Sequence, residues 1–174
     1  SLMIVGGSQG MVGAPLLAGR AAARAGAGKV HVGFMSQTAP QVDLGALELM
    51  LEPFIKFREK LSAAVIGPGL GTNAAATEAL AQGMRLGVPL VLDADALTLI
   101  SQNTSLSHRI RARTSPTVLT PHPREAARLL NLSIEDVNTD RIACARSLAE
   151  QFRAHVVLKG AGSVCVNATG ATSI

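Results

Sequence analysis

The sequence predicts an α/β fold in which a mainly parallel sheet lies between two layers of helices. Short apolar runs alternate along the chain with Ala- and Leu-rich stretches of helical character. This alternation is typical of sheets built from strand–helix–strand units. Several of the runs are apolar throughout, as expected for strands that are covered on both faces. We predict one domain over residues 1–174, without an internal linker or repeat.

The first half of the chain carries four strand patterns and two helix patterns. The predicted strands comprise residues 2–5, 29–34, 63–66 and 88–92, and the predicted helices comprise residues 14–25 and 73–85. Pro15 falls in the first turn of its helix, where proline is favoured. His31 alternates with valines in the second strand, so we assign it a structural role. Residues 36–62 show no regular period and are expected to be irregular.

Two glycine-rich loops follow predicted strands. Gly6-Gly7-Ser8 follows the first strand, and the run from Gly67 to Gly71 follows the third. Glycine allows a close approach of the backbone and directs its amides at an anion. We therefore regard these loops, with Gly69, as candidates for a phosphate site. The alternative is that each loop is an ordinary strand–helix connection.

The second half continues the same alternation. Its predicted elements are a short helix at 96–100, a strand ending at 118–119, a helix that begins at Pro123, a short helix capped at Ser133, a helix that ends near Phe152, a strand at 155–158 and a hairpin strand at 164–166. Asn138 or Thr139 is expected to cap the helix that ends near Phe152. The apolar residues of that helix recur at helical spacing, which predicts a packing role.

Two carboxylates follow the predicted strand that ends at Leu92. Asp93 lies at the carboxyl edge of the strand and is the better candidate for a phosphate or Mg²⁺ site. Asp95 is interpreted as the cap of the helix at 96–100, because aspartate is common at that position.

The turn from Thr120 to Glu125 joins a strand to a helix. Ligands of open α/β sheets bind beyond the carboxyl ends of the strands, and His122 lies on this turn. Glu125 falls in the first helical turn, where a carboxylate is stabilised by unpaired amides. The residues alone leave a second interpretation open, in which this is a well-capped helix start and nothing more.

Lys159 ends the strand at 155–158 and precedes Gly160-Ala161-Gly162-Ser163. An ammonium group beside free backbone amides and a hydroxyl suits a nucleotide phosphate. The segment is not a Walker sequence, so an exposed turn lysine is the alternative that spacing leaves open.

The composition argues against a nucleic-acid-binding protein. The formal net charge is +4, but there is no Trp or Tyr, and only four Phe residues could stack on bases. Binding to nucleic acid is therefore not expected. Arg109, Arg111 and Arg113 alternate in one polar segment that could meet phosphates. Such a run is more often a solvated face, and we interpret it as one.

The chain also lacks features of membrane and secreted proteins. No apolar run reaches the roughly 18 residues that a bilayer crossing needs, and no signal segment is present. Cys144 and Cys165 form no motif and are expected to be unpaired core thiols. We therefore predict a cytoplasmic protein.

Four of these motifs together resemble one family. Thr120-Pro121-His122 with Glu125 is similar to the site motif of the ADP/ATP-dependent NAD(P)H-hydrate dehydratases, which belong to the ribokinase-like superfamily. The runs 67–71, 92–97 and 159–162 match that family in the same order, so the resemblance covers essentially the whole chain. It implies a three-layer α/β/α ribokinase-like fold. Arg124 departs from the pattern, because the family usually has glycine there.

The resemblance implies a repair reaction that removes water from hydrated NADH or NADPH, with ADP or ATP as co-substrate and Mg²⁺ as cofactor. By position, Ala14, Gly71 and His122 would contact the hydrated dinucleotide. Lys159, Gly160, Ala161, Gly162 and Ser163 would hold the adenine nucleotide. Glu125 would help to place Mg²⁺, directly or through water.

The resemblance also sets expectations about what lies outside these residues. The family places its general base, an aspartate, in a later Gly-x-Gly-Asp segment, and no such segment occurs before Ile174. No catalytic residue is therefore expected within the chain. We expect the domain to be incomplete at the C-terminus and perhaps at the N-terminus, and the fragment alone to be inactive. A homo-oligomer, a tetramer by resemblance, and a fused or separate epimerase partner are also expected.

Two alternatives to this function stay open. One is a small-molecule kinase of the same superfamily, against which His122 in place of asparagine and the run 93–97 argue. The other is a non-catalytic nucleotide-binding module.

Overall fold

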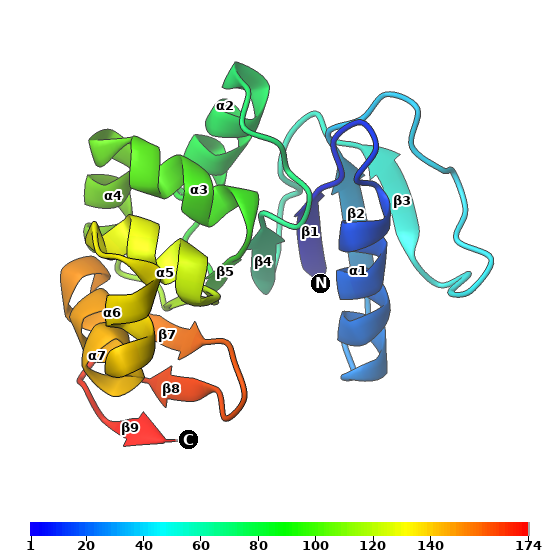
Figure 1. Cartoon of the computed structure of the whole chain (residues 1–174). Coiled ribbons are helices and arrows are strands. Elements are labelled where there is room, and N and C mark those ends of the chain that lie inside the picture. Colours follow the sequence, from blue (N-terminus) through cyan, green and yellow to red (C-terminus); the bar gives the residue numbers. More distant parts are fainter. Residues whose placement is uncertain (174) are drawn as a thin grey trace.

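A computed structural model describes residues 1–173 and contains one nine-stranded sheet in the order β3-β2-β1-β4-β5-β6-β7-β8-β9 (Figure 1). The strands are β1 (Leu2–Gly6), β2 (Val30–Phe34), β3 (Met50–Pro53), β4 (Ala63–Ile66), β5 (Leu90–Leu92), β6 (Thr117–Leu119), β7 (His155–Leu158), β8 (Val164–Val166) and β9 (Thr172–Ser173). All pairings from β3 to β7 are parallel, whereas β8 and β9 are antiparallel. The predicted mainly parallel α/β class is confirmed.

The direction in which the sheet grows reverses at β1. The chain passes from β1 to β2 and β3 on one side and then returns to place β4 on the other side of β1. Loops that follow strands on either side of such a switch point diverge and leave a crevice for ligands. Here these are the loops after β1 and after β4, which are the two glycine-rich runs of the sequence.

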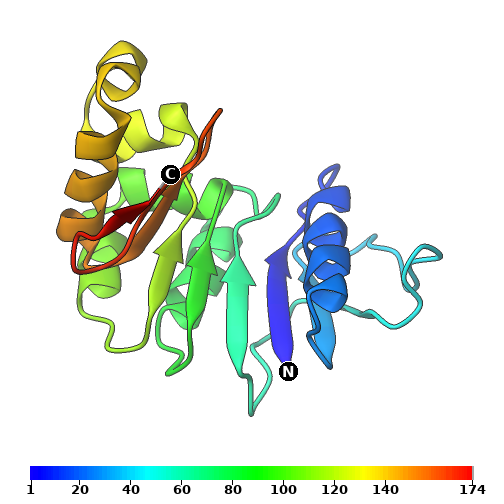
Figure 2. The same ribbon diagram turned by 90° about the horizontal axis from the view of Figure 1, so that it is seen from below.

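Helices cover the two faces of the sheet unequally. They are α1 (Gly13–Arg24), α2 (Ala74–Gly83), α3 (Asp95–Gln102), α4 (Thr104–Arg111), α5 (Pro123–Leu130), α6 (Ile134–Thr139) and α7 (Arg141–Phe152). Successive residues of a strand point to opposite faces. Ile4 of β1 packs in a small apolar cluster with residues of β2 and α1, whereas Met3 and Val5 belong to the larger cluster formed with α2–α7. One helical layer is therefore α1, and the other is α2–α7 (Figure 2).

The face that carries α1 is less well covered beyond β4. Val91, Val118 and Val157 lie on this face in neighbouring strands and are only half-buried. Across β6–β9 the surface forms a hollow of about 470 Å³ whose lining includes Val118, Val157 and Cys165. Of the two cysteines, both unpaired as predicted, Cys144 is buried and Cys165 lies on this half-buried face rather than in the core.

Two elements depart from the sequence prediction because their patterns are weak. β3 lies within the stretch 36–62 that was expected to be irregular. It has four residues, with Glu52 and Pro53 among them. Helix α4 was not predicted, because only Leu106 and Ile110 of its eight residues are buried. Its start is fixed by Asn103, whose side chain accepts hydrogen bonds from the amides of Ser105 and Leu106.

Two predicted helix ends were also wrong. The alanine-rich helix α2 ends at Gly83 rather than at residue 85. The long helix α7 begins after Asp140, whose carboxylate accepts from the Ala143 amide at 2.8 Å. Residues 138 and 139, predicted as its cap, are the last residues of α6. Within residues 1–173, no helix has the length and apolar character that crossing a bilayer requires.

Candidate nucleotide and substrate site

The two glycine-rich loops are bonded to each other at the switch point. The Gly7 amide donates to the Pro68 carbonyl at 3.0 Å, and the Ser8 amide donates to the Gly69 carbonyl at 2.6 Å. Gly67 has φ +132°, and a Cβ atom there would lie 1.7 Å from the Asp93 carbonyl oxygen. At Gly69 a Cβ would lie 2.7 Å from the Met11 carbonyl oxygen. Glycine is therefore required at both positions by the close approach of neighbouring backbone.

Ala14 and Gly71, which were predicted to contact the substrate, lie on either side of these two hydrogen-bonded loops. Ala14 is the second residue of α1, is half-buried, and donates its amide to the Met11 carbonyl at 3.3 Å. Gly71 has φ +81° and lies beside Ser8. The structure thus brings Ala14, Gly69 and Gly71 together around the loops of β1 and β4.

Asp95 has a different role from the predicted one. It is the first residue of α3, and Ala94 occupies the cap position without a side-chain hydrogen bond. The Asp95 carboxylate instead accepts from the Gly71 amide at 2.8 Å. The prediction that Asp95 caps the helix was wrong, because the loop after β4 offers it an unpaired amide. Asp95 therefore ties the end of β5 to the glycine loop of β4.

His122 caps α5 through a reciprocal pair of hydrogen bonds. Its Nδ1 accepts from the amides of Arg124 and Glu125 at 3.1 and 3.3 Å, while the Glu125 carboxylate accepts from the His122 amide at 2.8 Å. Because Nδ1 is an acceptor, the neutral imidazole carries its proton on Nε2. The His122 side chain is 46% exposed, and its Nε2 lies 3.3 Å from Glu125 Oε1.

Lys159 and two acidic residues form the most polar part of this edge. The Lys159 ammonium lies 2.7 Å from Asp93 Oδ1 and 4.0 Å from Glu125 Oε2. Its own amide donates to the Pro121 carbonyl at 2.8 Å, which joins the end of β7 to the turn before α5. The side chains of Asp93 and Lys159 are 30% and 40% exposed, whereas that of Glu125 is 7% exposed. Lys159 is thus a half-exposed ammonium held between two carboxylates.

These carboxylates are compatible with a metal ion that also binds phosphate. Among the residues that the structure describes, no group of three or more His, Cys, Asp or Glu side chains could hold a metal. Mg²⁺, however, usually takes only one or two protein carboxylates and completes its shell with water and substrate phosphates. Asp93 and Glu125 fit that pattern. Any cation between them would have to replace the Lys159 ammonium.

The loop from Gly160 to Ser163 is shaped by a residue that the sequence analysis missed. Arg141, at the start of α7, donates to the carbonyls of Leu158, Ala161 and Gly162 at 2.9–3.1 Å. Ser163 donates weakly to the Gly160 carbonyl at 3.4 Å. With its carbonyls engaged by Arg141, the loop keeps Gly160 and Gly162 exposed. No local pattern identifies Arg141, because its partners lie about twenty residues away.

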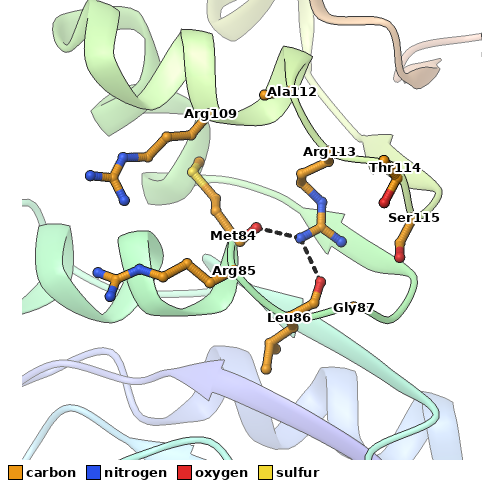
Figure 3. A pocket seen from close by; sticks show the side chains of 9 residues that line it. All are labelled: Met84, Arg85, Leu86, Gly87, Arg109, Ala112, Arg113, Thr114 and Ser115. Carbon is orange, nitrogen blue, oxygen red and sulfur yellow. Dashed lines mark hydrogen bonds between the residues drawn. The ribbon is translucent and has the colours of Figure 1, made fainter.

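The arginines expected to form a solvated face lie near the amino ends of the strands, opposite the candidate site. Arg109 and Arg111 are exposed, as predicted. Arg113 is half-buried instead, and it donates to the carbonyls of Met84 and Leu86 at 2.6 and 2.9 Å (Figure 3) and to that of Val88 at 2.7 Å. The prediction was therefore wrong for Arg113, which fixes the connection between α2 and β5.

Comparisons with a family model and with known proteins point to the same family. The NAD(P)H-hydrate dehydratase family model matches residues 2–174. The ADP-dependent (S)-NAD(P)H-hydrate dehydratase of Neisseria meningitidis serogroup B is 44% identical over 165 residues, which cover 92% of this chain and 55% of that protein. The bifunctional NAD(P)H-hydrate repair enzyme of Escherichia coli is 39% identical and is covered over 31% of its length. This chain thus spans about half of the first relative and a third of the second.

A solved structure shows the same fold. The ADP/ATP-dependent NAD(P)H-hydrate dehydratase of Bacillus subtilis, co-crystallised with ATP and Mg²⁺, superposes with a TM-score of 0.85. It is 28% identical, and the match covers 98% of this chain and 61% of that one. The predicted ribokinase-like three-layer fold is confirmed by this agreement.

Proposed function

Because the chain belongs to the NAD(P)H-hydrate dehydratase family, we propose that it serves the ADP- or ATP-dependent dehydration of hydrated NADH or NADPH. The observation that carries the proposal is the position of Lys159, next to Asp93 and Glu125, at the edge where the glycine loops also lie. Phosphoryl transfer needs a positioned cation and backbone amides more than covalent help from the protein.

The chemistry of the reaction explains why a nucleotide site adjoins a dinucleotide site. Hydroxide is a poor leaving group, and transfer of a phosphoryl group to the ring hydroxyl converts it into phosphate. Loss of that phosphate and of a proton from the adjacent carbon restores the ring double bond. The hydroxyl must therefore meet the terminal phosphate of the nucleotide in line. Two neighbouring subsites at one sheet edge satisfy this requirement.

We assign the subsites as follows. The adenine nucleotide lies on the loop from Lys159 to Ser163, where the exposed glycines offer amides to phosphate. The hydrated dinucleotide lies near Ala14, Gly71 and His122, with the Nε2–H of the half-exposed His122 ring as a donor that would exchange Glu125 for the ligand. The Lys159 ammonium is paired with Asp93, so contact with a phosphate would require it to exchange a carboxylate for that phosphate.

Mg²⁺ would supply charge neutralisation between the phosphates. Asp93 and Glu125 are the residues that would hold it, directly or through water. Glu125 already accepts from the His122 amide, so its carboxylate is fixed in orientation before any ligand arrives.

We also propose a cellular location, a partner domain and an oligomeric state for the protein. Unpaired cysteines are compatible with a cytoplasmic location. The bifunctional relatives, of which this chain covers about a third, support a fused or separate epimerase partner. We also keep the homo-oligomer as a proposal, which mass measurement in solution at several concentrations would test.

Nucleotide titration tests the central assignment. We expect calorimetry to detect binding of ADP or ATP with Mg²⁺, and Lys159→Met to weaken it about 10- to 150-fold, the equivalent of roughly 1.5–3 kcal/mol for a hydrogen bond to a charged group. Lys29→Met is the matched control, because Lys29 is exposed and precedes β2 at the opposite edge. Absence of nucleotide binding in the unaltered chain, or equal losses in both variants, would overturn the assignment.

A further inference from the structure

A pocket lies at the amino ends of β5 and β6, whereas the candidate site lies at the carboxyl ends of the strands. Its volume is about 300 Å³. It is lined by the connection after α2, residues 84–87, and by the end of α4 with the turn that follows, residues 109 and 112–115. Three of the lining residues are arginines: Arg85, Arg109 and Arg113 (Figure 3).

Arg113 is a half-buried cation that has no acidic partner within residues 1–173. Its Nε donates to the Thr117 hydroxyl, its Nη1 to the carbonyls of Met84 and Leu86, and its Nη2 to the carbonyl of Val88. A guanidinium has five N–H groups, so one on Nη2 has no acceptor among the described residues. Burial lowers the pKa of Arg113, and no carboxylate acts in the opposite direction. Three carbonyls and one hydroxyl, and no carboxylate among the described residues, therefore stabilise this charge.

Two further arginines, Arg85 and Arg109, give the pocket an excess of positive charge. Figure 3 shows Arg85 and Arg109 extending in the same direction from two sides of the pocket. The Arg109 side chain has no hydrogen bond or ion pair within residues 1–173. Arg85 pairs with Glu78 at 3.7 Å, and both side chains are more than 60% exposed. Such an exposed pair contributes little, so Arg85 can exchange Glu78 for a ligand at small cost.

We infer that this pocket binds a phosphate group. A tetrahedral dianion matches the planar donors of guanidinium groups, and the hydroxyls of Thr114 and Ser115 add donors on the Arg113 side. The guanidinium of Arg113 forms one wall. The exposed side chains of Arg85 and Arg109, which extend away from Arg113 in Figure 3, would turn toward the ligand on binding. The phosphate is either inorganic or the end of a small phosphate ester. The site is separate from the one assigned to the nucleotide and does not depend on that assignment.

Amide NMR of the complete chain tests the inference. Inorganic phosphate and glycerol phosphate are titrated in turn, at ionic strength held constant with chloride. We expect saturable shifts at Gly87, Thr114 and Ser115. A tighter response to glycerol phosphate than to inorganic phosphate would identify an ester as the ligand, and the reverse order would identify the free ion.

Variants separate the pocket from other anion sites. Arg85→Gln and Arg109→Gln are each expected to weaken the response about three- to fivefold, since each guanidinium is exposed, and the double variant should lose most of it. Arg24→Gln, an exposed arginine at the end of α1, and Lys159→Met should leave it unchanged. The inference is overturned if the three amides do not shift, if the shifts do not saturate, or if the double variant responds as the unaltered chain does.

Discussion

At the scale of single residues, His122 has a structural role as the cap of α5, and we propose a binding role for the same ring. Nδ1 caps α5, and Nε2 lies 3.3 Å from Glu125 Oε1 in a side chain that is 46% exposed. The sequence offered these as alternatives, a capped helix start or a ligand contact. The geometry allows both, because imidazole has two nitrogens that can act independently.

Substitution of His122 separates the two roles. His122→Ala removes the cap and should lower the free energy of unfolding by about 1 kcal/mol. His122→Asn keeps a capping oxygen and should retain most of that stability. Both remove the Nε2–H donor, so both should weaken binding of the hydrated dinucleotide. Urea unfolding and equilibrium binding measure the two effects, and the assignment fails if the asparagine variant binds the dinucleotide as well as histidine does.

Asp95 gives a second prediction at this scale. Its carboxylate accepts from the Gly71 amide at 2.8 Å, so Asp95→Ala leaves that amide unpaired. We expect hydrogen exchange at Gly71 to accelerate about tenfold or more, because a hydrogen bond to a charged acceptor is worth roughly 1.5–3 kcal/mol. Asp95→Asn retains an oxygen and should show a smaller increase. Unchanged exchange in the alanine variant would show that other contacts hold the loop.

Whether a residue's role could be predicted depended on how far along the chain its partners lie. Lys159 and the turn from Thr120 to Glu125 were identified because their neighbours along the chain suggest their chemistry. Arg141 and the Asp95–Gly71 bond were missed. Their partners lie 17–24 residues away, and local patterns carry no information about such contacts.

At the scale of elements, the strong periodic patterns were found and the weak ones were not. β2 was predicted nearly to its observed bounds, because its residues are all buried and apolar apart from His31 and Gly33. β3 contains Glu52 and Pro53 and depends on pairing with β2 for its conformation. Helix α4 depends on a cap and two buried side chains. Both form because tertiary packing supplies what local preference does not.

The pairing of β2 with β3 places a titratable group in the interior. His31 is buried, and its Nδ1 has no hydrogen-bond partner within residues 1–173. Burial lowers the pKa of His31. Arg58, Lys29 and the N-terminal ammonium lower it further, and Glu52 at 3.7 Å acts in the opposite direction. The folded chain therefore favours the neutral ring.

This shift predicts a pH-dependent stability. Because the pKa of His31 is lower in the folded chain than the ordinary value near 6.5, the unfolded chain binds more protons between the two pKa values. The contribution of His31 is complete above about pH 6.5 and is lost as the pH falls. We expect denaturant unfolding to show stability declining from pH 7 to pH 5, with a smaller slope in His31→Leu. His108→Gln, at an exposed site, should keep the original slope, and equal slopes in all three chains would contradict the prediction.

At the scale of the whole molecule, the strand order determines where the site lies. The glycine loops are 60 residues apart in the sequence, and only the reversal at β1 brings them into contact. Each motif could be identified from its residues, but their convergence required the fold. A parallel sheet also gathers the ends of β5, β6 and β7 at that edge, which is why Asp93, His122 and Lys159 meet there.

The same architecture makes the two faces of the sheet unequal, and neighbouring residues of β7 can test this. Val156 belongs to the core formed with α2–α7 and is 1% exposed, whereas Val157 lies on the half-buried face. Threonine matches valine in shape but carries a hydroxyl. Val156→Thr buries that hydroxyl without a designed partner and should lower the free energy of unfolding by about 1–3 kcal/mol. Val157→Thr leaves the hydroxyl near water and should cost less than about 0.5 kcal/mol.

Urea unfolding of both variants at the same pH measures the difference directly. The substitutions are chemically identical and lie in one strand, so strand propensity cancels between them. Equal, large losses would mean that the face bearing Val157 is covered in solution, and a second copy of the chain would then be the first occupant to examine by varying protein concentration. A loss confined to Val156→Thr would establish that the large cluster alone supplies the stabilising core of this half of the sheet.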